Sequence, residues 1–568
     1  MARSGDSYFV KRQTILAGAG IMMVASLLSR VLGLVRDKAI GHFWGRGLHT
    51  DAYWAAFNGP DLLYFLLAGG ALSAAIVPVF TGYLQRKEEG ESWKVANTLL
   101  TLLLGLAAVG VLVIEIFARQ LVLLIAPGFA ARPAQAAECA HFVRLLAPMV
   151  IFTVTSALST GILQAHRHFT APALAWPVFN FGVIGGAFVG GLMVNRHPAD
   201  PAGLVMPAVG VVIGALLLVV VQIPALLARG YRFRLGADFS HPGVQEALRL
   251  FLPYMAGLAF TQICLLWLPG FFGSYFAEGG VTSLRYANRL VVLPLGLFGI
   301  AISTAVFPAM AERIAAGEIA EFRTLFSGTL RAVFFLSVPC AVGLLVLAGP
   351  IVRLLWRGGQ FRENDVAAST FCLVLYALSL IGLSGLQITN RAFYSMKDRR
   401  VPPLVGIGYT VVIVLLAVGL MQTRLQYAAI AAATSVGTIV GLLVMFELLR
   451  RRLGGIDGRG ITLSFLRISA ASLALGVVAW WVSARTGSLL RVPATPFTLT
   501  APSVAGGGAA LAATASIGHV AIQVLLSMAA GLAAYLLVLF ALRAPELSDV
   551  RAALRQRRAR SAETVNAS

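Results

Sequence analysis

The sequence predicts an all-α polytopic membrane protein, and three observations support that fold class. Hydrophobic residues make up 58% of the 568 residues and charged residues only 12%, with a mean hydropathy of +0.82. Apolar runs of about 20 residues, long enough to cross a bilayer core of about 30 Å, recur from one end of the chain to the other. These runs fall into two groups of six that resemble each other. No polar stretch is long enough for a soluble catalytic domain, so that class of protein is excluded.

Length, interruptions and loop charge place about fourteen membrane-spanning helices along the chain. We expect the first six near residues 14–35, 52–84, 93–118, 139–163, 172–194 and 203–228. The next six are expected near 246–276, 281–312, 323–348, 366–391, 402–421 and 427–450. The last two follow near 464–483 and 517–542. No clear cleavage site ends the first apolar run, which favours an uncleaved helix over a signal peptide.

Basic residues gather in alternate short loops, which is typical of the cytoplasmic side of a membrane protein. The net charge of +21 therefore predicts topology rather than nucleic-acid binding. An even number of spans then places both termini in the cytoplasm. The basic groups are Lys11 and Arg12, Arg86 and Lys87, the arginines at 229, 232 and 234, Lys397 with Arg399 and Arg400, the arginines at 450–452, and the tail at 555–560.

An internal repeat organises the spans. "GGALSAAIVPVF" at 69–80 resembles "GIAISTAVFPAM" at 299–310, and Pro78 lies 230 positions before Pro308. Each copy holds six spans, so the copies are parallel repeats, as in transporters that bind substrate between their halves. We expect an N-terminal lobe at residues 1–228, a C-terminal lobe at 229–452, and a last segment of two helices with a basic tail at 453–568.

The first candidate site lies at the end of the first span, in "SRVLGLVRDK" at 29–38. Arg30 and Asp37 are seven residues apart and share a helical face, whereas Arg36 points elsewhere. Charged groups at bilayer depth are expensive unless they face protein or water. The alternative is that end-of-helix residues snorkel to the interface, which is favoured for Lys38. Arg30 and Arg36 are predicted to face a cavity.

The second candidate site is "SLRYANRL" at 283–290, early in the eighth span. Arg285, Asn288 and Arg289 stand at i, i+3 and i+4 and form one polar stripe. Two cations on one face repel each other, so they need an anion or an aqueous cavity nearby, unless both are interfacial. By the repeat offset Asn288 corresponds to Asn58, so both halves are predicted to present a polar group there.

Arginine's planar fork of donors suits phosphate oxygens, so these clusters predict an anionic substrate such as a pyrophosphate. Asp51 precedes the second span, where it either caps that helix or faces the cavity. The sequence has no GxxxxGK[ST] phosphate loop, so ATP hydrolysis is not expected. No metal or cofactor is expected either. We predict that the membrane potential or an ion gradient drives a transporter, not an enzyme.

Five motifs resemble the MurJ (MviN) family of bacterial lipid II flippases, within the multidrug/oligosaccharidyl-lipid/polysaccharide exporter superfamily. They are "SRVLGLVRD" at 29–37, "TDAYWAAFNGPDLL" at 50–63, "GALSAAIVPVF" at 70–80, "APGF" at 126–129 and "YANRLVVLPLGLFGIAISTAVFP" at 286–308. The resemblance spans the first twelve helices and implies a V-shaped pair of six-helix lobes around a cationic cavity. It also implies a groove between the last two helices for the undecaprenyl tail.

By this resemblance, Arg30, Arg36 and Arg289 match cavity arginines of the family. Asp37 matches the aspartate after the second arginine, and Asp51 matches the acidic residue before the second helix. Arg285 is a candidate replacement for a family arginine, because many members carry arginine and glutamate where this chain has Tyr64 and Gly69. An acidic residue often found after the eighth-helix arginine is also missing. The span 402–421 has no Asp, Asn or Glu, which speaks against the sodium site described for some members.

The resemblance implies a lipid II flippase of the bacterial inner membrane that works by alternating access. Arg30, Arg36 and Arg289 would bind the pyrophosphate, and Asp37 or Asp51 would pair with them when the cavity is empty. Lipid II, membrane lipids and the cell-wall synthesis machinery are the expected partners. The alternatives are a flippase for another polyprenyl-linked glycan, a membrane enzyme acting on the same lipid, and a non-transporting paralogue.

Overall fold

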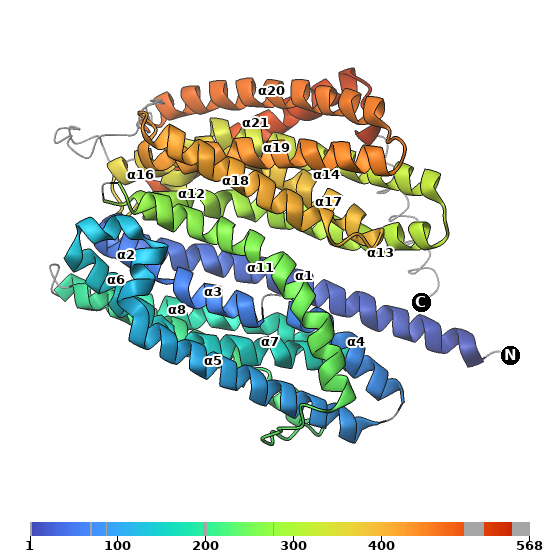
Figure 1. Cartoon of the computed structure of the whole chain (residues 1–568). Coiled ribbons are helices and arrows are strands. Elements are labelled where there is room, and N and C mark those ends of the chain that lie inside the picture. Colours follow the sequence, from blue (N-terminus) through green and yellow to red (C-terminus); the bar gives the residue numbers. More distant parts are fainter. Residues whose placement is uncertain are drawn as a thin grey trace. The chain divides into compact units, whose positions relative to one another are not determined.

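The structure, a computed structural model, describes residues 3–68, 71–86, 88–196, 201–276, 278–492 and 516–547. Long helices make up nearly all of this part of the chain (Figure 1). Within it, the only extended pairing is an isolated bridge between Gly358 and Phe361. The all-α membrane class predicted from composition is confirmed.

The chain forms two compact units, residues 1–282 with 358–362, and residues 283–357 with 363–568. The helices of the first unit are α1 (Arg3–Trp44), α2 (Leu48–Ala56), α3 (Asn58–Leu67), α4 (Ala71–Gln85), α5 (Glu89–Ile125), α6 (Pro133–Leu146), α7 (Met149–Ala165), α8 (Thr170–Arg196), α9 (Val205–Val220), α10 (Ile223–Leu227) and α11 (Pro242–Gly273).

Helix α12 (Gly280–Pro294) begins at the end of the first unit and continues into the second. The remaining helices of the second unit are α13 (Ala301–Ala315), α14 (Ile319–Val346), α15 (Ala348–Trp356), α16 (Glu363–Ala377), α17 (Ser379–Ser395), α18 (Val401–Met421), α19 (Ala429–Arg452), α20 (Gly458–Leu489) and α21 (Ile517–Ala541). α20 packs along both α14 and α21 (Figure 1).

Ten helices of the described residues are long and apolar enough to cross a membrane, or eleven if the bent pair α16–α17 counts as one span. The total of fourteen stays a prediction. The expected second span, 52–84, is divided among α2, α3 and α4. Pro60 in the first turn of α3 has no N–H to continue the α2 hydrogen-bond ladder, which favours a break there. The eighth span is continuous as Gly280–Ala315 and contains a π-helical turn, Leu295–Ile300.

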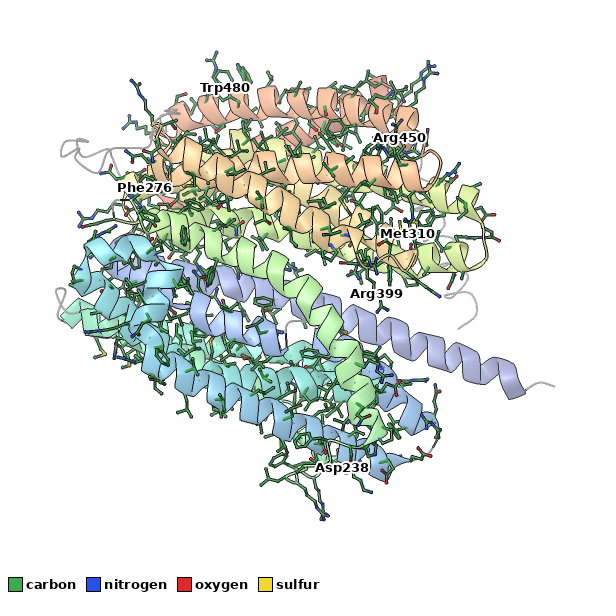
Figure 2. The ribbon with its side chains drawn as sticks, viewed as in Figure 1. Asp238, Phe276, Met310, Arg399, Arg450 and Trp480 are labelled. Atoms are coloured by element: carbon green, nitrogen blue, oxygen red, sulfur yellow. The ribbon has the colours of Figure 1, made fainter. Side chains whose placement is uncertain are left out.

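The two units divide at residue 282 rather than at 228, where the sequence places its lobe boundary. The reason is that α11 packs against α3, α4 and α5 of the first unit. Figure 2 shows Asp238, just before α11, and Phe276, just after it, at opposite ends of this unit. The three sequence lobes therefore describe the internal repeat, and as functional divisions they stay predictions.

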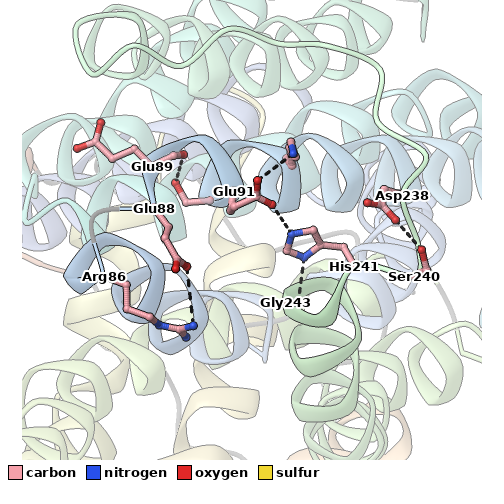
Figure 3. A network of polar contacts seen from close by, with 10 residues as sticks. Arg86, Glu88, Glu89, Glu91, Asp238, Ser240, His241 and Gly243 are labelled. Atoms are coloured by element: carbon pink, nitrogen blue, oxygen red, sulfur yellow. Dashed lines mark hydrogen bonds and ion pairs between the residues drawn. The ribbon is translucent and has the colours of Figure 1, made fainter.

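A polar network joins the starts of α5 and α11 (Figure 3). The N–H of Gly243 donates to Nδ1 of His241 at 3.1 Å, and Nε2 of the same ring lies 2.9 Å from a carboxylate oxygen of Glu91. Because Nδ1 accepts, the ring proton sits on Nε2 and is donated to Glu91. Lys94 donates to the other oxygen of Glu91 at 2.8 Å. His241 thus caps α11 and fixes its position against α5.

Candidate functional site

The first predicted cluster forms an ion pair on α1. Nε and Nη2 of Arg36 lie 2.8 Å and 2.7 Å from Oδ1 of Asp37. Asp37 is buried, with 3% of its surface exposed. Arg30, two turns earlier on the face of Asp37, is half-buried, as is Lys38. The sequence predicted that Arg36 points away from Asp37, but its long side chain bends back to the carboxylate.

Asn180 of α8 supports this pair, and sequence reasoning did not identify it. Its carbonyl oxygen lies 3.5 Å from Nη1 of Arg36, and its amide donates to the backbone and side-chain oxygens of Ser29, each at 3.3 Å. Asn180 is buried, and a buried amide in a membrane span points to a polar partner. The only signal in the sequence was an asparagine within an apolar run.

The second predicted cluster lies on α12 in the second unit. Arg285, Asn288 and Arg289 are all half-buried. Leu284, Ala287 and Val291 on the opposite face of the helix are fully buried. Beside the stripe, the ring of Tyr286 stacks on Trp356 at 5.0 Å between centroids. The polar stripe predicted from the i, i+3, i+4 spacing is therefore one face of a helix whose other face is packed in the core.

Asp51 neither caps its own helix nor lies exposed. Its carboxylate accepts hydrogen bonds from the backbone N–H groups of Gly279 and Thr282, both at 2.7 Å, and from the Thr282 hydroxyl at 2.6 Å. Only 1% of Asp51 is exposed. Arg46 adds two bonds, from Nε to the Gly279 carbonyl at 3.0 Å and from Nη2 to the Glu278 carbonyl at 2.8 Å. The expected cap of the second span is thus a cap of α12 instead.

Asn58 is buried between α3 and α11. Its exposed fraction is 7%, and a Cβ atom on Gly270 would collide with its amide nitrogen. Its repeat counterpart Asn288 is half-buried, so the two positions differ in exposure. That Asn58 lines a cavity stays a prediction. Tyr64 is half-buried in α3, and Gly69 lies outside the described residues.

The described part of the chain contains no group of three His, Cys, Asp or Glu side chains that could hold a metal ion. Arginine and asparagine are instead the groups at both predicted clusters, and the first cluster adds the aspartate Asp37. Their guanidinium donors can bind phosphate oxygens bidentately, and carboxylates can release or recapture those donors without covalent chemistry.

Comparisons with known proteins agree with this chemistry. A family model described as "Lipid II flippase MurJ" matches residues 40–500. A probable lipid II flippase MurJ of Rhizobium meliloti is 32% identical over 462 residues, covering 80% of this chain and 84% of that protein. The lipid II flippase MurJ of Burkholderia cenocepacia is 27% identical over 478 residues, covering 82% of this chain and 91% of that protein.

Solved structures show the same fold. A lipid II flippase MurJ in an inward closed conformation matches with a TM-score of 0.72 at 22% identity, over 91% of this chain and 97% of that chain. An inward-facing multidrug resistance transporter of the MATE family and MOP superfamily matches with a TM-score of 0.63 at 14% identity, over 77% and 98% of the two chains.

Proposed function

Because the chain belongs to the lipid II flippase MurJ family, we propose that it moves lipid II from the inner to the outer leaflet of the cytoplasmic membrane. Lipid II is a disaccharide peptide linked to undecaprenyl through a pyrophosphate. The chain is a multi-pass inner-membrane protein of all-α fold. The proposed transport is by alternating access, and no bond of the substrate is made or broken.

The observation that carries this proposal is the buried ion pair between Arg36 and Asp37. An unpaired arginine in a low-dielectric site is strongly unfavourable, so Asp37 compensates the charge of Arg36 while no substrate is bound. A pyrophosphate brings several oxygens of higher negative charge, which favours exchange of the guanidinium from Asp37 to the ligand. Asp37 would recapture Arg36 after the pyrophosphate leaves.

Arg30 supplies a second cation on the same helix, and Arg285 and Arg289 supply the corresponding cations of the second unit. Asn180 and Ser29 position Arg36 through hydrogen bonds. We infer that Asn288 and the arginines of α12 bind the pyrophosphate at one stage of the cycle, and that Asp51 holds the first turn of α12 through its hydrogen bonds.

The energy source follows from the substrate's charge. An inside-negative potential contributes about 2.3 kcal/mol per charge per 100 mV, which favours outward movement of net negative charge. We propose that this potential or an ion gradient drives transport, without a resident cofactor or metal. Both termini are proposed to lie in the cytoplasm, because the basic linkers on their side follow the positive-inside pattern. Enzymes of cell-wall synthesis that make and use lipid II are the proposed neighbours.

The test is rescue of a bacterium whose own lipid II flippase can be shut off, with lipid II on the outer face measured alongside growth. The wild-type chain is expected to restore both. Arg30→Ala, Arg36→Ala and Arg289→Ala are expected to fail at equal expression. Arg36→Lys is expected to fail as well, because an ammonium group cannot donate bidentately. Arg399→Ala, which removes an exposed arginine, is the matched control and is expected to rescue fully.

Three outcomes would contradict the proposal. If all arginine variants restore outer-face lipid II, the clusters do not bind the substrate. If a well-expressed wild type restores nothing, a flippase for another polyprenyl-linked glycan is favoured, since Tyr64 stands where many relatives have arginine. If growth is restored without lipid II exposure, the chain acts as a non-transporting partner.

A further inference from the structure

A cavity of about 370 Å³ lies within the second unit, between the first turns of α14 and the linker from α19 to α20. We call it the α14–α20 pocket. Its polar wall includes Arg323, Ser327 and Arg331, and the facing wall includes Gly455 and Asp457. None of these residues belongs to the clusters proposed for lipid II.

The arginine wall has unused donors. Arg323, Ser327 and Arg331 stand at i, i+4 and i+8 of α14 and therefore share a face. Nη2 of Arg323 donates to the carbonyl of Leu453, while its buried Nε meets no acceptor among the described residues. Nε of Arg331 has one long contact of 3.4 Å to the Ser327 carbonyl. Within the described part of the chain, neither arginine forms an ion pair with a carboxylate.

The carboxylate in the facing wall is already engaged. Oδ1 of Asp457 accepts the N–H of Gly460 at 3.1 Å and so caps α20, and Oδ2 accepts the hydroxyl of Ser327 at 3.2 Å. Gly455 has φ +127°, a backbone conformation that side-chain-bearing residues rarely adopt. The linker can therefore turn beside the pocket, and the two arginines keep an excess of positive charge over the single aspartate.

The pocket lies where phospholipid headgroups are expected. α14 has 28 residues, about 42 Å of helix, so its first turns extend beyond a bilayer core of about 30 Å. Figure 2 shows Met310, Arg399 and Arg450 at one end of this unit, near the linkers that the positive-inside pattern assigns to the cytoplasm. Anionic lipids concentrate in that leaflet, and basic pockets between helices bind their headgroups.

We propose that the α14–α20 pocket binds the phosphate of an anionic phospholipid headgroup, with Arg323 and Arg331 as the charged donors. Guanidinium groups match phosphate oxygens in geometry as well as charge. The bound lipid would join α14 to the start of α20, the helix that follows the twelve repeated spans. This site goes beyond the proposed function, because it takes a lipid that is not transported.

The test is native mass spectrometry of the full chain in a zwitterionic detergent, titrated separately with phosphatidylglycerol, phosphatidylcholine and glycerol 3-phosphate. The first phosphatidylglycerol is expected to bind the wild type more tightly than phosphatidylcholine. Arg331→Gln is expected to weaken that binding about tenfold, as loss of a charge-assisted hydrogen bond does. Arg399→Gln removes an exposed arginine at the same end of the unit and is expected to leave binding unchanged.

Arg323→Lys is the second variant, because lysine keeps the charge and can still reach the Leu453 carbonyl. It is expected to fold and to bind phosphatidylglycerol less tightly than the wild type. Unchanged binding in both variants would overturn the proposal, as would an equal loss in Arg399→Gln. If glycerol 3-phosphate binds as tightly as phosphatidylglycerol, the lipid assignment is wrong and the pocket takes a soluble phosphate. The flippase assay with Arg331→Gln tests the proposed function separately from phosphatidylglycerol binding.

Discussion

At the scale of single residues, Asp51 shows how one carboxylate can determine the start of a distant helix. α12 begins at Gly280 and follows Gly279, and neither glycine has a side chain to accept the first N–H groups of the helix. Asp51 supplies that acceptor from α2 and takes a third hydrogen bond from the Thr282 hydroxyl. The buried charge is thus satisfied by helix donors, which complement a negative group at a helix N-terminus.

Replacing Asp51 is therefore expected to destabilise the protein. Asp51→Ala leaves the N–H groups of Gly279 and Thr282 without their acceptor, and loss of such a cap costs about 1–2 kcal/mol. Thr282→Val removes only the hydroxyl donor and is expected to cost about 1 kcal/mol. Thermal unfolding in lipid nanodiscs measures both. Asp238→Ala removes an exposed carboxylate bonded to Ser240 and is the control; an equal loss there would refute the capping role.

At the scale of elements, close helix packing depends on small residues. α8 and α9 approach so closely that a Cβ on Gly182 or Gly186 would collide with the backbone of α9. Apolar side chains gain little by leaving lipid, so backbone approach and dispersion contacts hold membrane helices together. The positions of the glycines along α8 thus decide which face of α8 packs against α9. α8 in turn positions Asn180 against Arg36 of α1.

Two neighbouring glycines of α8 give a matched test of this packing. A Cβ on Gly186 would meet the Met206 carbonyl, whereas a Cβ on Gly185 would meet open space. Gly186→Ala is expected to destabilise the protein by about 1–3 kcal/mol, as overpacking does. Gly185→Ala is expected to be neutral or slightly stabilising, because alanine favours the helix. The fraction folded after heating measures both, and equal values would contradict the predicted interface.

At the scale of the whole molecule, the basic linkers predict which side of the membrane each helix end faces. α18 has 21 residues, about 32 Å of helix, and separates the exposed Arg399 from the exposed Arg424. The lysine and arginines before α18 mark the cytoplasmic end under the positive-inside rule. Arg424 then lies on the outer side.

Cysteine labelling of intact cells tests this topology. A membrane-impermeant maleimide is expected to modify Arg424→Cys but not Arg399→Cys, and both are expected to react after the membrane is permeabilised. The unsubstituted chain, with its four cysteines, provides the background. Of these, Cys139 and Cys372 are buried and Cys340 is half-buried. The reverse pattern would invert the proposed orientation and place the α14–α20 pocket on the outer side.

Sequence patterns predicted where the polar clusters lie, but not which residues their side chains contact. The charges of Arg30, Arg36, Asp37, Arg285 and Arg289 are conspicuous in apolar runs, because hydrophobicity is a local property. The pairing of Arg36 with Asn180 joins residues 144 positions apart and has no local signature. The repeat predicted that Asn58 presents a polar group to a cavity. The burial of Asn58 depends on its packing against Gly270 of α11, which the repeat does not reveal.

The sequence by itself determined the all-α membrane class, the family and the cationic character of both clusters, because these follow from composition, periodicity and contiguous motifs. The tertiary structure alone decided that α11 packs with the first unit, that Asp51 caps α12 and not its own helix, and that two arginines of α14 line a pocket with the α19–α20 linker. Hydrogen bonds and packing join residues distant in the chain, so only their positions in space specify these contacts.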